Sequence, residues 1–185
     1  MKVPVGVSNR HVHMTAEVYE KLFGDQNITF KNAIFQPGQF AAEQTITIKT
    51  EAGEIEKVRV VGPFRPYTQV EVSKTDTFKL KINPPIRTSG DLVDAETITL
   101  VGPKGEVTLK AVIIADRHLH ITTKQASELG IKNNDIITAV IKTEKPGTIE
   151  VKAKVTEDAF FCIDLDTDDA NGFLIANNDE IEIQL

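Results

Sequence analysis

"VSNRHVHMT" at residues 7–15 and "ADRHLHITT" at residues 115–123 carry the same phrase, Arg-His-x-His, and together they contain all four histidines of the 185-residue chain. Each phrase follows an apolar run. A capping threonine then predicts a short helix, over residues 16–23 after the first phrase and 124–129 after the second, and a glycine ends each helix. This unit is an internal repeat, and it predicts two related halves that each contribute a histidine phrase.

The rest of the chain is predicted to be mainly β. Runs that alternate or are rich in Val, Ile and Thr are punctuated by turn residues such as Pro103-Lys104-Gly105. Strands are predicted over residues 45–50, 57–62, 68–73, 78–82, 97–102, 106–115, 135–142, 148–155 and 179–185. Short strands at this spacing favour barrels or sandwiches over a parallel α/β sheet, so we expect a mainly β fold with few short helices.

Composition limits the classes of protein to consider. A chain with 41 % hydrophobic and 26 % charged residues is typical of a globular protein, and the net charge of -6 argues against nucleic acid as a partner. The single cysteine, Cys162, excludes an intramolecular disulfide or a cysteine-rich zinc framework, and in "AFFCID" we expect it to lie in the core. With neither a membrane-length apolar segment nor a signal peptide, we expect a cytoplasmic protein without a membrane partner.

The histidine phrases are candidate metal ligands. On an extended chain, residues i and i+2 point to the same face, so His11 and His13 project together, as do His118 and His120. Paired imidazoles suit a transition metal, whereas satisfied surface histidines are the alternative, which the repetition disfavours. Nitrogen ligands without thiolate favour zinc, with cobalt, nickel or iron as alternatives. The two pairs could complete one site or begin two.

Four arginines are candidates for substrate binding or for support. Arg10 and Arg117 precede the histidine pairs, and either salt bridges or substrate contacts would explain them. Arg65 follows a Gly-Pro turn, and Arg87 stands between Pro-Pro and Thr-Ser-Gly. A guanidinium beside small hydroxyl residues in a rigid turn suits an oxyanion such as phosphate, although loop arginines are often simply solvated.

Several segments occur in the order found in one family. They are "PVGVSNRHVHMT", "QPGQFAAEQT", "GPFRPYTQVEVS", "PPIRTSGD", "ITLVGPKGEV", "ADRHLHIT" and "DTDDANG". Over residues 3–185 the chain resembles the phosphotransacylases typified by phosphate propanoyltransferase of bacterial microcompartments. The resemblance implies two small β-barrels of intertwined connectivity, a di-zinc site between them and a homodimer or higher homo-oligomer. It also implies reversible transfer of an acyl group between coenzyme A and inorganic phosphate.

On this basis we expect residues 1–10 and 113–185 to form the first barrel and residues 11–94 the second. We expect residues 95–112 to form a hairpin between the barrels near the active site. Members of the family inside microcompartments carry an N-terminal targeting extension, and its lack here favours a freely cytosolic form.

The resemblance also assigns site residues. It implies that His11, His13, His118 and His120 are metal ligands, with Glu71 as the carboxylate ligand. Arg65 matches the arginine associated with phosphate, and Ser89 lies in the "SGD" stretch near the substrate, so both are candidate catalytic residues. Arg87 remains a candidate for substrate binding.

One position departs from the family. Members usually carry a further histidine in a phrase like H-x-D-T-D-x-A-N, where this chain has Asp164. We expect Asp164 to bind the metal through oxygen; the alternative is a carboxylate that points to solvent and leaves one metal site weak. We expect the nearby Asp166, Asp168 and Asp169 to form a turn and helix cap rather than a calcium loop.

The expected chemistry is direct attack of phosphate on an acyl thioester, because no Ser-His-Asp or Cys-His arrangement is visible. Two alternatives stay open. One is a zinc-dependent hydrolase. The other is a non-catalytic or altered homologue that binds coenzyme A or metal and has lost activity with the histidine at position 164.

Overall fold

The computed structural model describes residues 1–184, and the chain divides into two compact units. Unit 1 comprises residues 1–9, residues 35–37 and the chain from residue 116 onward, and unit 2 comprises residues 10–34 and 38–115. The chain begins in unit 1, enters unit 2 after Asn9, contributes residues 35–37 to unit 1 and returns to unit 1 after Ala115. Each histidine phrase therefore follows directly after a crossing from one unit to the other, which is the intertwined connectivity that the family resemblance implied.

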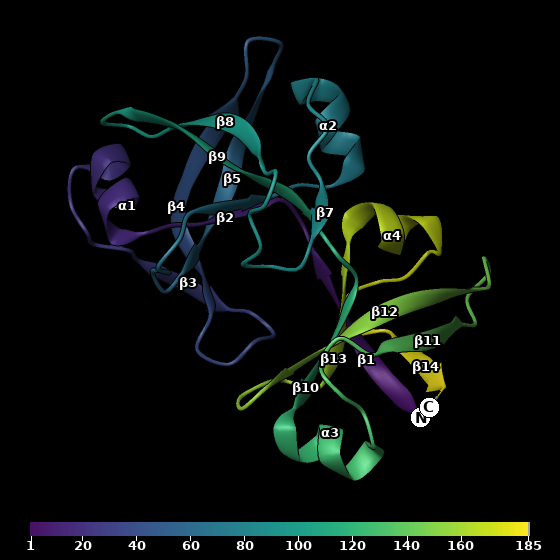
Figure 1. The fold of residues 1–185 in the computed structure, drawn as a ribbon. Helices are drawn as coiled ribbons and strands as arrows, with labels where there is room; N and C mark the ends of the chain where they lie inside the picture. Colours follow the sequence, from purple (N-terminus) through teal and green to yellow (C-terminus); the bar gives the residue numbers. More distant parts are fainter. Residues whose placement is uncertain (185) are drawn as a thin grey trace. The chain divides into compact units, whose positions relative to one another are not determined.

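Unit 1 is a closed six-stranded barrel. The strand order is β1 (Lys2–Ser8), β13 (Cys162–Asp166), β10 (His118–Thr122), β12 (Gly147–Thr156), β11 (Ile136–Ile141) and β14 (Glu180–Gln184). Alternate residues of these strands face inward, and the enclosed core is almost entirely aliphatic, with Val5, Leu119, Ile163 and Val151 at most 1 % exposed. Figure 1 shows β1, the purple N-terminal strand, beside β13 and β14 of the C-terminal part of the chain.

Unit 2 contains a second ring of six strands. The ring consists of β4 (Phe40–Lys49), β5 (Glu54–Gly62), β2 (His11–His13), β6 (Gln69–Glu71), β9 (Glu106–Ala115) and β8 (Glu96–Val101). It closes because β8 pairs with both β9 and β4. Two further strands, β3 (Phe30–Ala33) and β7 (Ile86–Arg87), pair with β4 and β9. The hairpin set apart in the sequence at residues 95–112 is thus part of the unit 2 barrel, because β8 is needed to close it.

The two rings share one pairing pattern around the histidine strands. In unit 2, β2 runs antiparallel to β6 and parallel to β5, with His11 opposite Glu71. In unit 1, β10 runs antiparallel to β13 and parallel to β12, with His118 opposite Asp164. The internal repeat therefore extends beyond the histidine phrase to the strand that places a carboxylate across from its first histidine.

Within residues 1–184, four short helices accompany the strands: α1 (Ala16–Phe23), α2 (Lys74–Leu80), α3 (Thr123–Leu129) and α4 (Thr167–Gly172). The helices predicted after the histidine phrases are confirmed, with Thr15 and Thr122 as N-caps and Gly24 and Gly130 in left-handed conformations at their ends. Asp166 caps α4, as expected for the acidic cluster. In the part of the chain that the structure describes, no helix is long and apolar enough to cross a bilayer.

One predicted strand, over residues 78–82, is wrong. Ser73 and Asp76 form a capping box that begins α2, so the backbone is helical up to Leu80. Alternation in "FKLKI" suggested that Phe78 and Leu80 share a buried face, but Phe78 is 71 % exposed and Leu80 is fully buried. The prediction for residues 179–185 corresponds to β14, and its last residue lies outside the described part of the chain.

Candidate functional site

The first candidate metal centre lies in unit 2. His11 and His13 project from the same face of β2, with ring centroids 4.9 Å apart and ring planes nearly perpendicular. The antiparallel partner β6 brings Glu71 alongside, so that its Oε2 lies 3.6 Å from His11 Nε2. The three residues are at most 9 % exposed. Each offers one ligand atom, and these atoms lie within 4.8 Å of one another, which is the spacing of a metal-binding triad.

His13 gives the clearest indication that this site suits a cation. Its Nδ1 is buried and has no hydrogen-bond partner within residues 1–184. Burial, with smaller effects from the neighbouring His11 and Arg65, holds the pKa of His13 well below its usual range, so the ring is neutral at neutral pH. A buried polar nitrogen without a partner is costly, and a bound metal ion would supply that partner. The residues present therefore fit a transition metal.

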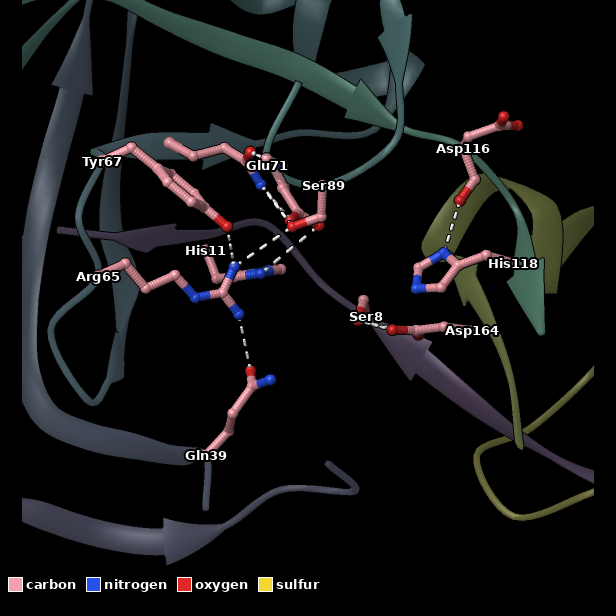
Figure 2. Close-up of polar contacts among 12 residues, drawn as sticks. Ser8, His11, Gln39, Arg65, Tyr67, Glu71, Ser89, Asp116, His118 and Asp164 are labelled. Carbon is pink, nitrogen blue, oxygen red and sulfur yellow. Dashed lines mark hydrogen bonds and ion pairs between the residues drawn. The ribbon is translucent and has the colours of Figure 1, made fainter. Parts of the chain in front are cut away.

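The second candidate metal centre lies in unit 1 and has the same layout. The His118 Nδ1–H donates to the carbonyl oxygen of Asp116 at 2.8 Å, which leaves His118 Nε2 as the ring's lone-pair nitrogen, 2.9 Å from His120 Nε2. Asp164 Oδ2 lies 4.0 Å from that His120 nitrogen. Ser8 donates to Asp164 Oδ1 at 3.0 Å and orients the carboxylate, as Figure 2 shows. The structure thus brings Asp164 together with both histidines.

The arginine before each histidine pair forms an ion pair within its own unit. Arg10 Nε lies 2.7 Å from Asp76 Oδ1, and Arg117 makes a two-pronged contact with Asp169 at 2.7 and 2.6 Å. Each aspartate stands in the first turn of the helix that follows its triad's carboxylate strand. Both arginines therefore tie the start of a histidine strand to a helix, which favours the supporting role over substrate contact.

A third cluster in unit 2 surrounds the guanidinium of Arg65. Its NH1 group donates to Tyr67 Oη at 3.0 Å and to Ser89 Oγ at 3.3 Å, and its NH2 group donates to Gln39 Oε1 at 3.1 Å. Figure 2 shows these partners around the side chain. All of them are neutral, and no carboxylate within residues 1–184 pairs with Arg65. A fixed positive charge held by neutral partners is suited to contact an anion.

Comparisons with known proteins give the family. The family model described as phosphate propanoyltransferase matches residues 4–176. The chain belongs to this family. A phosphate propanoyltransferase of Thermotoga maritima is 44 % identical over 183 residues, covering 97 % of this chain and 87 % of the relative. One of Priestia megaterium is 47 % identical over 96 % of this chain and 83 % of the relative. One of Salmonella typhimurium is 41 % identical over 91 % of this chain and 82 % of the relative.

Membership in the phosphate propanoyltransferase family makes the protein an enzyme, a phosphate acyltransferase. It gives no support to an acyl-enzyme through Cys162. Cys162 is 1 % exposed, and burial raises the pKa of its thiol to about 12. Its Sγ accepts a hydrogen bond from Gln36. The expectation of a core cysteine is confirmed.

Arg87 has different surroundings from Arg65. Its Nε donates to the carbonyl oxygen of Val93 at 3.0 Å, its NH1 donates to the carbonyl oxygen of Ile86 at 3.0 Å, and Asp91 and Asp94 pair with it. These partners belong to its own loop. The substrate role of Arg87 stays a prediction, while its contacts support a role in holding the loop after β7.

In this phosphate propanoyltransferase family member Gln69 is fully buried between the triad and the Arg65 cluster, a role that was not predicted from the sequence. A signal was present. In "TQVEVS" the polar Gln69 and Glu71 alternate with the apolar Val70 and Val72, so both polar residues face the same side of β6. The pairing of the supporting arginines with Asp76 and Asp169 was also not predicted, although both aspartates stand in the first turn of a helix.

Proposed function

We propose that this phosphate acyltransferase transfers a short acyl group reversibly between coenzyme A and inorganic phosphate, with one zinc ion in each triad. Family membership supports the acyl transfer to phosphate. The observation that carries the proposal is the Arg65 guanidinium, which is held by neutral partners in the same unit as a buried His-His-Glu triad. An uncompensated cation beside a metal-binding triad suits a doubly charged oxyanion such as phosphate.

The donor sets favour zinc. Each triad offers two imidazole nitrogens and one carboxylate oxygen, a ligand set that catalytic zinc takes while keeping a position open for water or substrate. When bound, zinc would supply Lewis acidity for a phosphate or thioester oxygen. Contacts within the chain hold the ligand side chains in fixed orientations. The Asp116 carbonyl fixes the tautomer of His118, and Ser8 orients Asp164. In Asp164 the second triad keeps a carboxylate ligand in place of the family's histidine.

The residues of the Arg65 cluster would bind and orient phosphate. Arg65 presents a planar set of donors, and the Ser89 hydroxyl adds one more, so hydrogen bonds from the protein replace part of the water around the anion. In the reaction a phosphate oxygen forms a bond to the thioester carbonyl carbon. The carbon–sulfur bond breaks, coenzyme A leaves as a thiolate that takes up a proton, and acyl phosphate is the other product. Cys162 takes no part, since it is buried and protonated.

The test is an assay with acetyl-CoA and propanoyl-CoA in the presence and absence of phosphate. Release of the coenzyme A thiol and formation of acyl phosphate, trapped as the hydroxamate, are measured together. We expect thiol release that depends on phosphate and equals acyl phosphate formation. Thiol release with free acid and no dependence on phosphate would instead identify a hydrolase, and tight binding of coenzyme A without turnover would identify a non-catalytic homologue.

A further inference from the structure

Gln69 links the unit 2 triad to the Arg65 cluster. It is a fully buried residue of β6 with three hydrogen bonds. Its Nε2 donates to Glu71 Oε1 at 2.6 Å and to Ser89 Oγ at 2.9 Å, and its Oε1 accepts from the backbone N–H of Gly90 at 2.7 Å. One side chain therefore contacts both a candidate metal ligand and the loop that carries a candidate phosphate ligand.

The orientation of the Gln69 amide is fixed by Gly90. A backbone N–H can only donate, so the atom facing it must be the amide oxygen, and the NH2 group must face Glu71 and Ser89. Gly90 adopts a left-handed φ of 102° to present this N–H, a conformation that other residues rarely adopt. Both amide hydrogens of Gln69 are thereby used, one on each partner.

The hydrogen bond from Gln69 gives the two oxygens of Glu71 different partners. Oε1 accepts the hydrogen bond from Gln69, while Oε2 is the oxygen 3.6 Å from His11 Nε2. A carboxylate fixed in this way presents one defined oxygen to the triad. In unit 1 the hydroxyl of Ser8 also holds a carboxylate, although it lies within hydrogen-bonding distance of both Asp164 Oδ1, at 3.0 Å, and Oδ2, at 3.3 Å. Donors that orient a metal-binding carboxylate typically change metal affinity when they are removed.

The consequence for Ser89 is a fixed direction for its hydrogen. A hydroxyl can accept two hydrogen bonds and donate one. Ser89 Oγ accepts from Gln69 Nε2 at 2.9 Å and from Arg65 NH1 at 3.3 Å, which uses both acceptor positions. The Ser89 hydroxyl can therefore still donate one hydrogen bond, and an anionic oxygen is a suitable acceptor.

We propose that Gln69 is a positioning residue that couples the unit 2 metal triad to the phosphate site. It holds Glu71 with Oε2 toward His11, and it commits Ser89 to donate a hydrogen bond to phosphate. This inference rests on the proposed function, because it assumes a metal ion at the triad and phosphate at Arg65.

The test compares two glutamine-to-methionine variants of the full chain. Gln69→Met keeps the length of the side chain and removes both donors. Gln44→Met is the matched control, because Gln44 also lies in unit 2 and uses both ends of its amide, accepting from Thr29 N at 3.0 Å and donating to Thr29 Oγ1 at 2.9 Å. Metal-free protein is titrated with Co²⁺ and followed by visible absorption, and the KM for phosphate is measured with the zinc-loaded enzyme.

In Gln69→Met we expect one of two classes of Co²⁺ site to weaken by about 10- to 100-fold, with the other unchanged. We also expect the phosphate KM to rise by roughly 3- to 10-fold, the effect of one weakened hydrogen bond. Adding Ser89→Ala should increase the KM by less than it does in the natural background, because both changes disable the same contact. Gln44→Met should bind Co²⁺ and phosphate as the natural protein does, even if its melting temperature falls.

A folded Gln69→Met protein with natural Co²⁺ titration and natural phosphate KM would overturn the inference while leaving the proposed function intact. A natural protein that binds no Co²⁺ or forms no acyl phosphate would instead contradict the proposed function. If Gln69→Met does not fold, ¹⁵N NMR of the natural protein provides the test. The Gln69 side-chain amide should exchange slowly and shift on addition of zinc and again on addition of phosphate, and an amide that responds to neither would refute the coupling.

Discussion

Replacing Arg65 tests the anion site most selectively. Its NH1 and NH2 groups are held by Tyr67, Ser89 and Gln39, so the guanidinium is oriented in advance while its charge has no carboxylate partner among the described residues. Arg65→Gln removes the charge and the planar set of donors. A hydrogen bond to a charged group contributes about 1.5–3 kcal/mol, so we expect the KM for phosphate to rise roughly 10- to 100-fold.

The assay is the initial rate of thiol release as a function of phosphate at saturating acyl-CoA, with a melting curve to confirm folding. Arg65→Lys should recover only part of the loss, because an ammonium group lacks the planar geometry of a guanidinium. Arg87→Gln serves as the comparison. Its guanidinium is occupied by its own loop, so we expect a much smaller change in the phosphate KM. An unchanged phosphate dependence in Arg65→Gln would refute the assignment of the phosphate site.

Three further predictions concern single residues. Asp164→Ala should lose one metal ion per chain after dialysis, whereas Asp164→His should keep it, and equal metal content in the natural and alanine proteins would rule out a ligand role for Asp164. Cys162 should not react with a thiol reagent at pH 8 until denaturant is added, because burial raises its pKa to about 12; fast reaction in the native protein would contradict that burial. Burial also holds the pKa of His13 well below its usual value of about 6.5, so the unfolded chain takes up a proton that the folded chain does not. The metal-free protein should therefore lose up to about 1.4 kcal/mol of stability per pH unit below about pH 6.5, and thermal melts should show a smaller slope in His13→Gln.

The local structure around the histidines was predictable from the sequence because it rests on short-range rules. Alternation places His11 and His13 on one face, and a capping threonine followed by a glycine sets the limits of each short helix. The resemblance to the family supplied Glu71 and Asp164, which are distant in sequence from the histidines they join. No pattern within a single segment would have paired them.

Other features depended on contacts that a single segment does not reveal. Residues 78–82 alternate like a strand, but the capping box at Ser73 begins a helix that continues through Leu80. The role of Gln69 emerges only when β6 and the loop at Ser89 and Gly90 come together. Arg65 and Arg87 stand in similar turns in the sequence, and only their partners distinguish a charge held by neutral groups from one paired with loop carboxylates.

The two metal centres are tested most directly by the metal content of untagged protein, measured by elemental analysis together with acyl transfer before and after chelation. Two triads of ligand atoms predict about two transition-metal ions per chain. Phosphate-dependent acyl transfer should be lost when the metal is removed and restored when zinc is added back. Metal-free protein with full acyl-transfer activity would contradict a role for the two metal centres in acyl transfer.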